Sequence, residues 1–344
     1  MGKSIFLCLA GCDFRLTWLV SSETGKEKAR KLFINKTKCL LQSGVLTAEE
    51  SALKIDRKTV TTDPGDLKDC DLIIEAITED IGLKKALFES LDKAVNAACI
   101  FATNSSAILP MQLVPSENRQ DRFCGLHFFY PLAMKNMVEL ITNPSTSSQT
   151  KELLLQFLSQ INKTPFIQDE SNAFVLNRLF LDFQAGAFLV FMEGQLSYHE
   201  IDELVREHLF PIGVFEFFDH VGIDVMLSSV KAYTKDMSNK ALYTPLIEKM
   251  EELVKLNQLG IKTKQGFYDY MQKEEKVVNA TDTSKGKSVY KLMVTERLWD
   301  YYFKSVMSVI EKGLISREDL AYAIKDYMGM DSDPFTLPFS DSIN

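Results

Sequence analysis

One histidine and one glutamate in neighbouring apolar segments are well suited to acid–base chemistry. His127 lies in segment 125–131, and Glu139 follows it among the apolar residues of segment 137–141. An imidazole that is neutral near pH 7 can take a proton from a hydroxyl. A buried carboxylate is costly unless it has a partner, so pairing with His127 would account for Glu139 and would orient the ring. An ordinary buried ion pair is the alternative that these two residues leave open.

Polar side chains also occur where two other segments end or begin. Asn104, Ser105 and Ser106 follow an apolar segment that ends at Thr103, and ligands bind at the carboxyl edge of open α/β sheets. The alternative for this cluster is ordinary turn chemistry. Asn177 begins a long helical segment, where its amide could face an interdomain cleft or simply cap the helix.

The elements that must position these residues alternate between strands and helices. Near-continuous apolar runs predict strands, whereas three- and four-residue periodicity predicts the helices between them. This alternation indicates a doubly wound α/β domain with a parallel sheet, spanning residues 1–169. The expected strands are 14–20, 72–77, 100–103, 123–129 and 137–141, and the expected helices include 23–42 and 84–95.

Beyond residue 169 the helical periodicity predicts all-α domains at 170–272 and 288–344, joined by a polar linker at 273–287. Segment 174–192 would form one long helix, with Gly194 at its end. The residues from Arg178 to Ser197 match those from Arg297 to Ser316 at one constant offset. We therefore predict a duplicated helical domain, in which Asn177 corresponds to Glu296 and the second copy is a structural partner. Its first copy continues to Pro211 and Phe215, which have rough counterparts in Pro334 and Phe335.

Composition narrows the class of protein. A formal net charge of −8 argues against nucleic-acid binding, which needs a basic face. We see neither an apolar run of the roughly 18–20 residues that cross a bilayer nor a signal peptide, so we expect no membrane partner. The six cysteines include no CxxC pair, which favours a reduced, cytoplasmic protein without a disulfide framework or metal site.

The order of these motifs resembles the L-3-hydroxyacyl-CoA dehydrogenase family over nearly the whole chain. The motifs are DCDLIIEAITED at 69–80, NSS at 104–106, GLHFFYP at 125–131, Glu139, NRL at 177–179 and KTKQGFYDY at 262–270. The resemblance implies NAD-dependent oxidation of an L-3-hydroxyacyl-CoA to a 3-oxoacyl-CoA, in fatty-acid β-oxidation or short-chain acyl-CoA metabolism. It also implies an acyl-CoA substrate and either a monomer or a homodimer.

The resemblance further implies roles for single residues. His127 would be the catalytic base and Glu139 would hold it, whereas Ser106 and Asn177 would hydrogen-bond the substrate oxygen. The cofactor-binding residues would be Gly2, Glu79, Lys84 and Asn104.

The amino end departs from the family pattern. The family opens with a strand, a GxGxxG turn and a helix, but only Met1-Gly2 resembles that fingerprint here. Residues 4–10 match the first helix, with Gly11 as its cap, because a strand at 5–9 would leave too short a crossover to the next strand. The first strand is therefore expected to be missing, as in a truncated gene model, a fragment or a degenerate relative.

Other departures are smaller. Trp18 or Leu19 stands where the family has a ribose-binding acid, Tyr130 stands where Asn is frequent, and residues 172–173 replace a frequent Pro-Gly. Two other functions stay open: a non-catalytic acyl-CoA-binding relative, and a hydroxy-acid or sugar-acid dehydrogenase on the same scaffold. Three basic residues could meet CoA phosphates, although a solvated helix face is the alternative for them: Lys54, Arg57 and Lys58.

Overall fold

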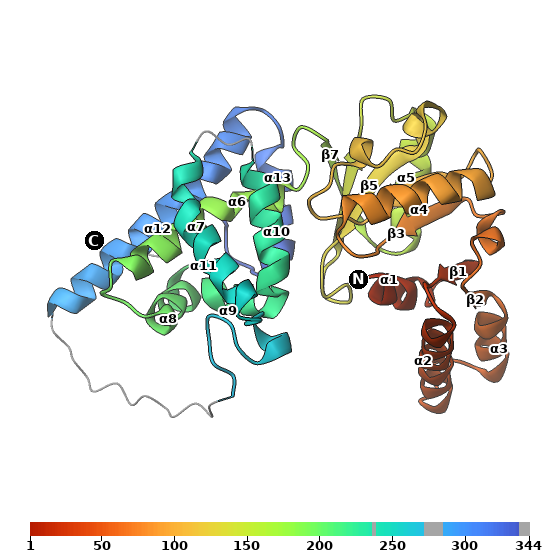
Figure 1. Ribbon diagram of the computed structural model, residues 1–344, viewed down its shortest axis with the longest axis horizontal. Helices are drawn as coiled ribbons and strands as arrows, with labels where there is room; N and C mark the ends of the chain where they lie inside the picture. The colour runs from red at the N-terminus through yellow and green to blue at the C-terminus, as the bar shows by residue number, and fades with distance from the viewer. Residues whose placement is uncertain (236–238, 272–284, 337–344) are drawn as a thin grey trace. The chain divides into compact units, whose positions relative to one another are not determined.

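The computed structural model describes residues 1–235, 239–271 and 285–336. The chain forms two compact units, residues 1–173 and 174–344, which are described separately below (Figure 1). The boundary lies close to the one predicted at residue 169. The two helical domains predicted at 170–272 and 288–344 belong to one compact unit.

The first unit contains a five-stranded sheet with strand order β3-β4-β5-β6-β7. Strands β3, β4 and β5 are parallel, β6 is antiparallel to β5, and β7 is parallel to β6. The antiparallel strand is a feature that the prediction of a parallel sheet did not include. The bounds are β3 Leu72–Glu75, β4 Ile100–Thr103, β5 Phe123–Phe128, β6 Met137–Thr142 and β7 Thr164–Asp169.

Helices cover both faces of this sheet, as the doubly wound prediction requires. Phe88 of α4 packs with Phe101 and Phe123, whereas Leu154 of α5 belongs to a second cluster with Leu126 on the opposite face. Successive strand residues point to opposite faces, which is why Phe123 and Leu126 lie in different clusters. The helices of this unit other than α1 are α2 Glu23–Gln42, α3 Ala48–Asp56, α4 Ile81–Ala94 and α5 Ser148–Gln160, with 3-10 turns at Pro64–Leu67, Pro110–Gln112 and Glu117–Arg122.

Strands β1 (Leu16–Leu19) and β2 (Lys58–Thr61) form a separate parallel pair, so β1 has no strand partner in the larger sheet. Residues Gly2–Leu9 form helix α1, which confirms the predicted helix, although it is capped by Ala10 and not by Gly11. The apolar side chains of α1 contact both sheets. Phe6 stacks on Trp18 of β1 at 4.7 Å between ring centroids, whereas Ile5 and Leu9 pack with buried residues of β4 and β5. Packing through α1 therefore joins the two sheets.

The second unit is helical. Its long apolar segment is divided at Phe180, so the predicted single helix at 174–192 is two helices. Phe174 precedes them with a left-handed φ of 59°, an uncommon conformation for a bulky residue. The helices are α6 Val175–Leu179, α7 Leu181–Met192, α8 Tyr198–His208, α9 Val214–Val221, α10 Ile223–Thr234, α11 Thr244–Lys255, α12 Lys285–Glu311 and α13 Arg317–Met328, with 3-10 turns at Lys240–Leu242 and Ile261–Thr263.

Helix α7 is apolar on all sides because it is the core helix of this unit. Gly186 lies against the ring of Tyr301 on α12, and a Cβ at Gly186 would come within 2.4 Å of that ring. By length and composition the stretch Val175–Met192 could cross a membrane, although no apolar run of that length was expected from the sequence. However, 67% of this stretch is buried within the protein. That degree of burial is typical of a core helix.

The pairs α7–α8 and α12–α13 have the same local design, as the predicted repeat requires. Gly194 and Gly313 take left-handed φ values of 75° and 65° after the first helix of each pair. Ser197 and Ser316 then cap the second helix, each accepting a hydrogen bond from the backbone N–H three residues later. Most of the predicted linker, residues 273–284, lies outside the described residues, and 285–287 begin α12.

Candidate active site

His127 and Glu139 face each other across an antiparallel strand pair. They are register partners on β5 and β6, and His127 Nδ1 lies 2.5 Å from Glu139 Oε2. Their side chains are 8% and 0% exposed. A carboxylate accepts hydrogen bonds, so Nδ1 carries the proton and Nε2 is the nitrogen that can exchange one. The structure confirms that the two side chains predicted to pair are in contact.

Gln168 on β7 completes this arrangement. Its Nε2 donates to Glu139 Oε1 over 3.1 Å, so both carboxylate oxygens have partners. Phe129 packs its ring edge-on to the imidazole at 4.6 Å between centroids. Gln168 was not predicted from the sequence, where a lone amide in a partly buried strand is its one signal. Together these contacts fix the orientation of the His127 ring.

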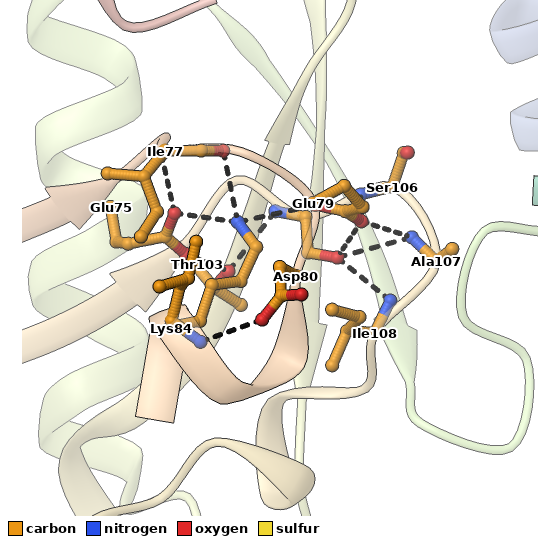
Figure 2. A network of polar contacts seen from close by, with 11 residues as sticks. Glu75, Ile77, Glu79, Asp80, Lys84, Thr103, Ser106, Ala107 and Ile108 are labelled. Carbon is orange, nitrogen blue, oxygen red and sulfur yellow. Dashed lines mark hydrogen bonds and ion pairs between the residues drawn. The ribbon is translucent and has the colours of Figure 1, made fainter. Parts of the chain in front are cut away.

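Ser106 lies in the loop after β4, and Glu79 holds that loop (Figure 2). Glu79 Oε1 accepts from the backbone N–H of Ser106 at 3.0 Å and of Ala107 at 3.2 Å, and from the hydroxyl of Ser105. The Ser105 hydroxyl also accepts from the N–H of Ile108 at 2.8 Å. The carboxylate of Glu79 therefore stabilises the turn that carries Ser106 by accepting three hydrogen bonds from it.

Lys84 connects Glu79 to a second, fully buried carboxylate (Figure 2). Its Nζ lies 2.6 Å from Glu75 Oε1 and 3.3 Å from Glu79 Oε2, and the lysine side chain is 1% exposed. Glu75 also accepts from Thr103 Oγ1 at 2.7 Å and from the N–H of Ile77 at 2.6 Å. Lys84 and Glu79 were predicted to bind the cofactor. In the structure Glu79 binds the Ser106 loop and Lys84 binds Glu79, whereas their predicted contact with the cofactor stays a prediction. Glu75, which also binds Lys84, was not predicted from the sequence.

Asn104 joins the ends of two strands. Its Oδ1 accepts from the backbone N–H of Phe128 at 2.9 Å, next to His127 on β5. Its own N–H donates to the carbonyl of Glu75 at 2.8 Å. Asn104 thus aligns the segments that carry Ser106 and His127, whereas its predicted contact with the cofactor stays a prediction.

Asn177 lies on α6 in the helical unit, where both ends of its amide meet tyrosine hydroxyls. Nδ2 donates to Tyr233 Oη at 2.9 Å, and Oδ1 accepts from Tyr327 Oη at 3.1 Å. Asn177 is therefore neither a helix cap nor a packed core residue. Glu296, its counterpart in the predicted repeat, is exposed on α12.

The residues at the amino end fit a dinucleotide in part. Helix α1 begins at Gly2 without a side-chain cap and without an acid in its first turn, so its first N–H groups suit a pyrophosphate. Gly2 lies against Ala76, just after β3, and a Cβ there would be 3.6 Å from Ala76. Strand β1 ends at Leu19 without an acid, and the first acid beyond it, Glu23, accepts from Thr62. The start of α1 is thus the part of the GxGxxG fingerprint region that is present in this chain and suited to binding NAD.

Other predicted groups have structural partners. Lys54 and Lys58 donate to backbone carbonyls of the turn between α1 and β1, and Arg57 pairs with Asp13. These three basic residues therefore stabilise the turn between α1 and β1. Among the described residues there is no cluster that could hold a metal ion.

The motif at 262–270 is bound by two buried aspartates. Asp219 accepts from the N–H groups of Phe267 and Tyr268 at 2.9 Å each, and Asp202 accepts from the hydroxyl of Tyr268 at 2.8 Å. Burial raises the pKa of both aspartates, despite these hydrogen bonds. Gly266 is required here, because a Cβ would come within 2.0 Å of Asp219. The two aspartates thus hold the motif against the helical unit, and Phe267 is its one buried residue.

Comparisons with known families agree with this architecture. Residues 1–171 match the family model described as 3-hydroxyacyl-CoA dehydrogenase, NAD binding domain, and residues 174–270 match that of the corresponding C-terminal domain. A 3-hydroxybutyryl-CoA dehydrogenase of Clostridioides difficile is 34% identical over 274 residues, which are 78% of this chain and 96% of that protein.

Two solved structures are also similar. The (S)-3-hydroxybutyryl-CoA dehydrogenase of Ralstonia eutropha is 31% identical, with a TM-score of 0.70 over 79% of this chain and 96% of that one. A 3-hydroxybutyryl-CoA dehydrogenase of Escherichia coli is 21% identical, with a TM-score of 0.79 over 98% of this chain and 88% of that one. At that identity the second comparison shows the fold alone.

Proposed function

The chain belongs to the 3-hydroxyacyl-CoA dehydrogenase family, and on that basis we propose that it oxidises the C3 hydroxyl of an L-3-hydroxyacyl-CoA to a ketone. NAD is its cofactor. The setting would be fatty-acid β-oxidation or short-chain acyl-CoA metabolism, in a cytoplasmic monomer or homodimer. All six cysteines are free thiols, which supports a reducing compartment.

The observation that carries this proposal is the buried contact between His127 and Glu139. Oxidation of an alcohol releases one proton from the hydroxyl, and an oriented imidazole can accept it at Nε2. Glu139 holds Nδ1 at 2.5 Å and stabilises the imidazolium that results. A carboxylate with no exposed surface and a second donor, Gln168, is preorganised for this task.

The remaining residues act on the substrate oxygen. Ser106 and Asn177 donate hydrogen bonds to it, and these bonds strengthen as negative charge develops during proton removal. Glu79 and Lys84 keep the loop of Ser106 in place, and Asn104 aligns it with β5. The first N–H groups of α1 would hold the pyrophosphate of NAD, and the cofactor would supply the acceptor for the hydride from C3.

Calorimetry and a spectrophotometric assay test this function. We expect the chain to bind NADH and acetoacetyl-CoA and to oxidise NADH when both are present. Binding of acetoacetyl-CoA without binding of NADH would instead identify a non-catalytic acyl-CoA-binding relative. Activity on free hydroxy acids but not on CoA thioesters would contradict the proposed substrate class.

A further inference from the structure

The amide of Asn177 is held at both ends. Its Nδ2 donates to Tyr233 Oη at 2.9 Å, and its Oδ1 accepts from Tyr327 Oη at 3.1 Å. The terminal torsion of an asparagine is otherwise broad, so a lone amide samples many orientations. Two hydroxyls on opposite ends restrict that torsion to one orientation.

The two hydroxyls come from helices far apart in the sequence. Tyr233 lies on α10, in the first helical copy, and Tyr327 lies on α13, in the second. Neighbouring rings hold each of them: Phe174 lies 6.2 Å from the ring of Tyr233, and Phe180 stacks on Tyr327 at 5.6 Å and 27°. Both rings thus have fixed positions before any ligand binds.

The backbone that carries Asn177 is also constrained. Helix α6 has only five residues, with Phe174 in the left-handed conformation before it and the break at Phe180 after it. A bulky residue rarely adopts a positive φ, and it does so only where the surrounding structure imposes that conformation. Phe174 and Phe180 flank Asn177 in the chain, and they are the residues whose rings contact the two tyrosines.

This arrangement leaves Asn177 able to donate once more. An asparagine amide has two N–H donors and a carbonyl acceptor. One N–H goes to Tyr233, and among the described residues the other has no partner. Donation from Tyr327 to Oδ1 draws electron density from the amide, which strengthens the remaining N–H as a donor.

We propose that Tyr233 and Tyr327 are positioning residues that hold the Asn177 amide in the one orientation from which it donates to its substrate. This inference rests on the proposed function, in which Asn177 donates to that oxygen. It also gives the second copy of the predicted repeat a role, because α13 supplies one of the two hydroxyls that hold the Asn177 amide.

A double-mutant cycle tests the inference with acetoacetyl-CoA as the probe. Affinity is measured by calorimetry, and NADH oxidation is measured alongside it. We expect Tyr327→Phe and Tyr233→Phe each to weaken acetoacetyl-CoA affinity about threefold to tenfold, the range that the net value of one hydrogen bond implies. The phenylalanine keeps the ring contacts, so thermal unfolding should change little.

The decisive measurement is the same substitution in an Asn177→Ala background. A positioning residue acts only through Asn177, so Tyr327→Phe should then have no further effect on affinity or turnover. Equal losses in both backgrounds would overturn the inference, because they would indicate a general structural effect. Tyr322→Phe, on the exposed side of the same helix, is the matched control and should leave affinity unchanged.

The outcomes also separate this inference from the function on which it rests. Absence of acetoacetyl-CoA binding, or Asn177→Ala that binds as tightly and turns over as fast as the parent, would refute the assignment of Asn177 itself. Loss of affinity in Asn177→Ala but not in the two tyrosine variants would leave the proposed function standing and refute only the positioning by Tyr233 and Tyr327.

Discussion

Lys84 and Glu75 form an ion pair from which solvent is excluded: Nζ lies 2.6 Å from Oε1, and the two side chains are 1% and 0% exposed. Glu79 shares the same Nζ at 3.3 Å. Two carboxylates therefore depend on one lysine. The pair lies at the carboxyl end of β3 and holds, through Glu79, the loop that carries Ser106.

Replacing this lysine should destabilise the first unit strongly. Lys84→Met leaves the buried carboxylate of Glu75 without its counter-charge, which costs about 3–5 kcal/mol. Urea unfolding measures the change in the free energy of unfolding. Lys85→Met, at the exposed neighbouring position on α4, is the matched control and should change stability by no more than about 0.5 kcal/mol. A loss below about 1 kcal/mol for Lys84→Met would contradict the importance of the pair.

Removing Glu79 should release the loop without removing the strands beneath it. In Glu79→Ala the N–H groups of Ser106 and Ala107 lose their acceptor, so their hydrogen exchange should accelerate about tenfold. The N–H of Phe128, which Asn104 holds, serves as the internal reference and should exchange as before. Unchanged exchange at Ser106 and Ala107 would show that Glu79 does not order the loop.

Removing the imidazole should abolish most of the catalysis while leaving the fold intact. We expect His127→Ala to lower turnover of NADH with acetoacetyl-CoA by roughly 10²–10⁴, the usual contribution of a general base. Asn177→Ala should slow the same step, whereas Glu296→Ala, at the corresponding exposed position of the predicted repeat, should not. Undiminished turnover in His127→Ala would overturn its assignment, and equal losses at Asn177 and Glu296 would contradict a single site.

The buried Asp202 should make stability depend on pH. Burial raises its pKa above the ordinary value of 3.8, so the folded protein binds the proton more tightly than the unfolded chain does. Its contribution to the free energy of unfolding is therefore fully present below pH 3.8 and is lost as the pH rises through the folded pKa. The parent should thus lose stability relative to Asp202→Asn as the pH is raised from about 3.5. Urea unfolding of both proteins at several pH values measures this difference, and a difference that does not vary with pH would refute the shift.

Strands β1 and β3 to β6 of the first unit and the pairing of His127 with Glu139 could be predicted from the sequence, whereas strands β2 and β7 and the antiparallel direction of β6 were not predicted. Apolar runs mark the buried strands, and a lone histidine and a lone carboxylate within such runs each require a partner. Because β5 and β6 are adjacent antiparallel strands joined by a short connection, His127 and Glu139 are also near one another in the chain. The contact between His127 and Glu139 was predictable because both residues interrupt apolar runs and because only 12 positions separate them in the sequence.

The groups that surround these residues are known only from the folded chain. Gln168 reaches Glu139 from 29 residues away, and Tyr233 and Tyr327 reach Asn177 from 56 and 150 residues away. Amides and hydroxyls occur throughout the chain, and nothing in their local sequence specifies which partner they meet. Lys84 and Glu79 illustrate the same point, because only the folded chain shows that Lys84 pairs with Glu79 and that Glu79 binds the Ser106 loop. Their predicted contact with the cofactor stays a prediction.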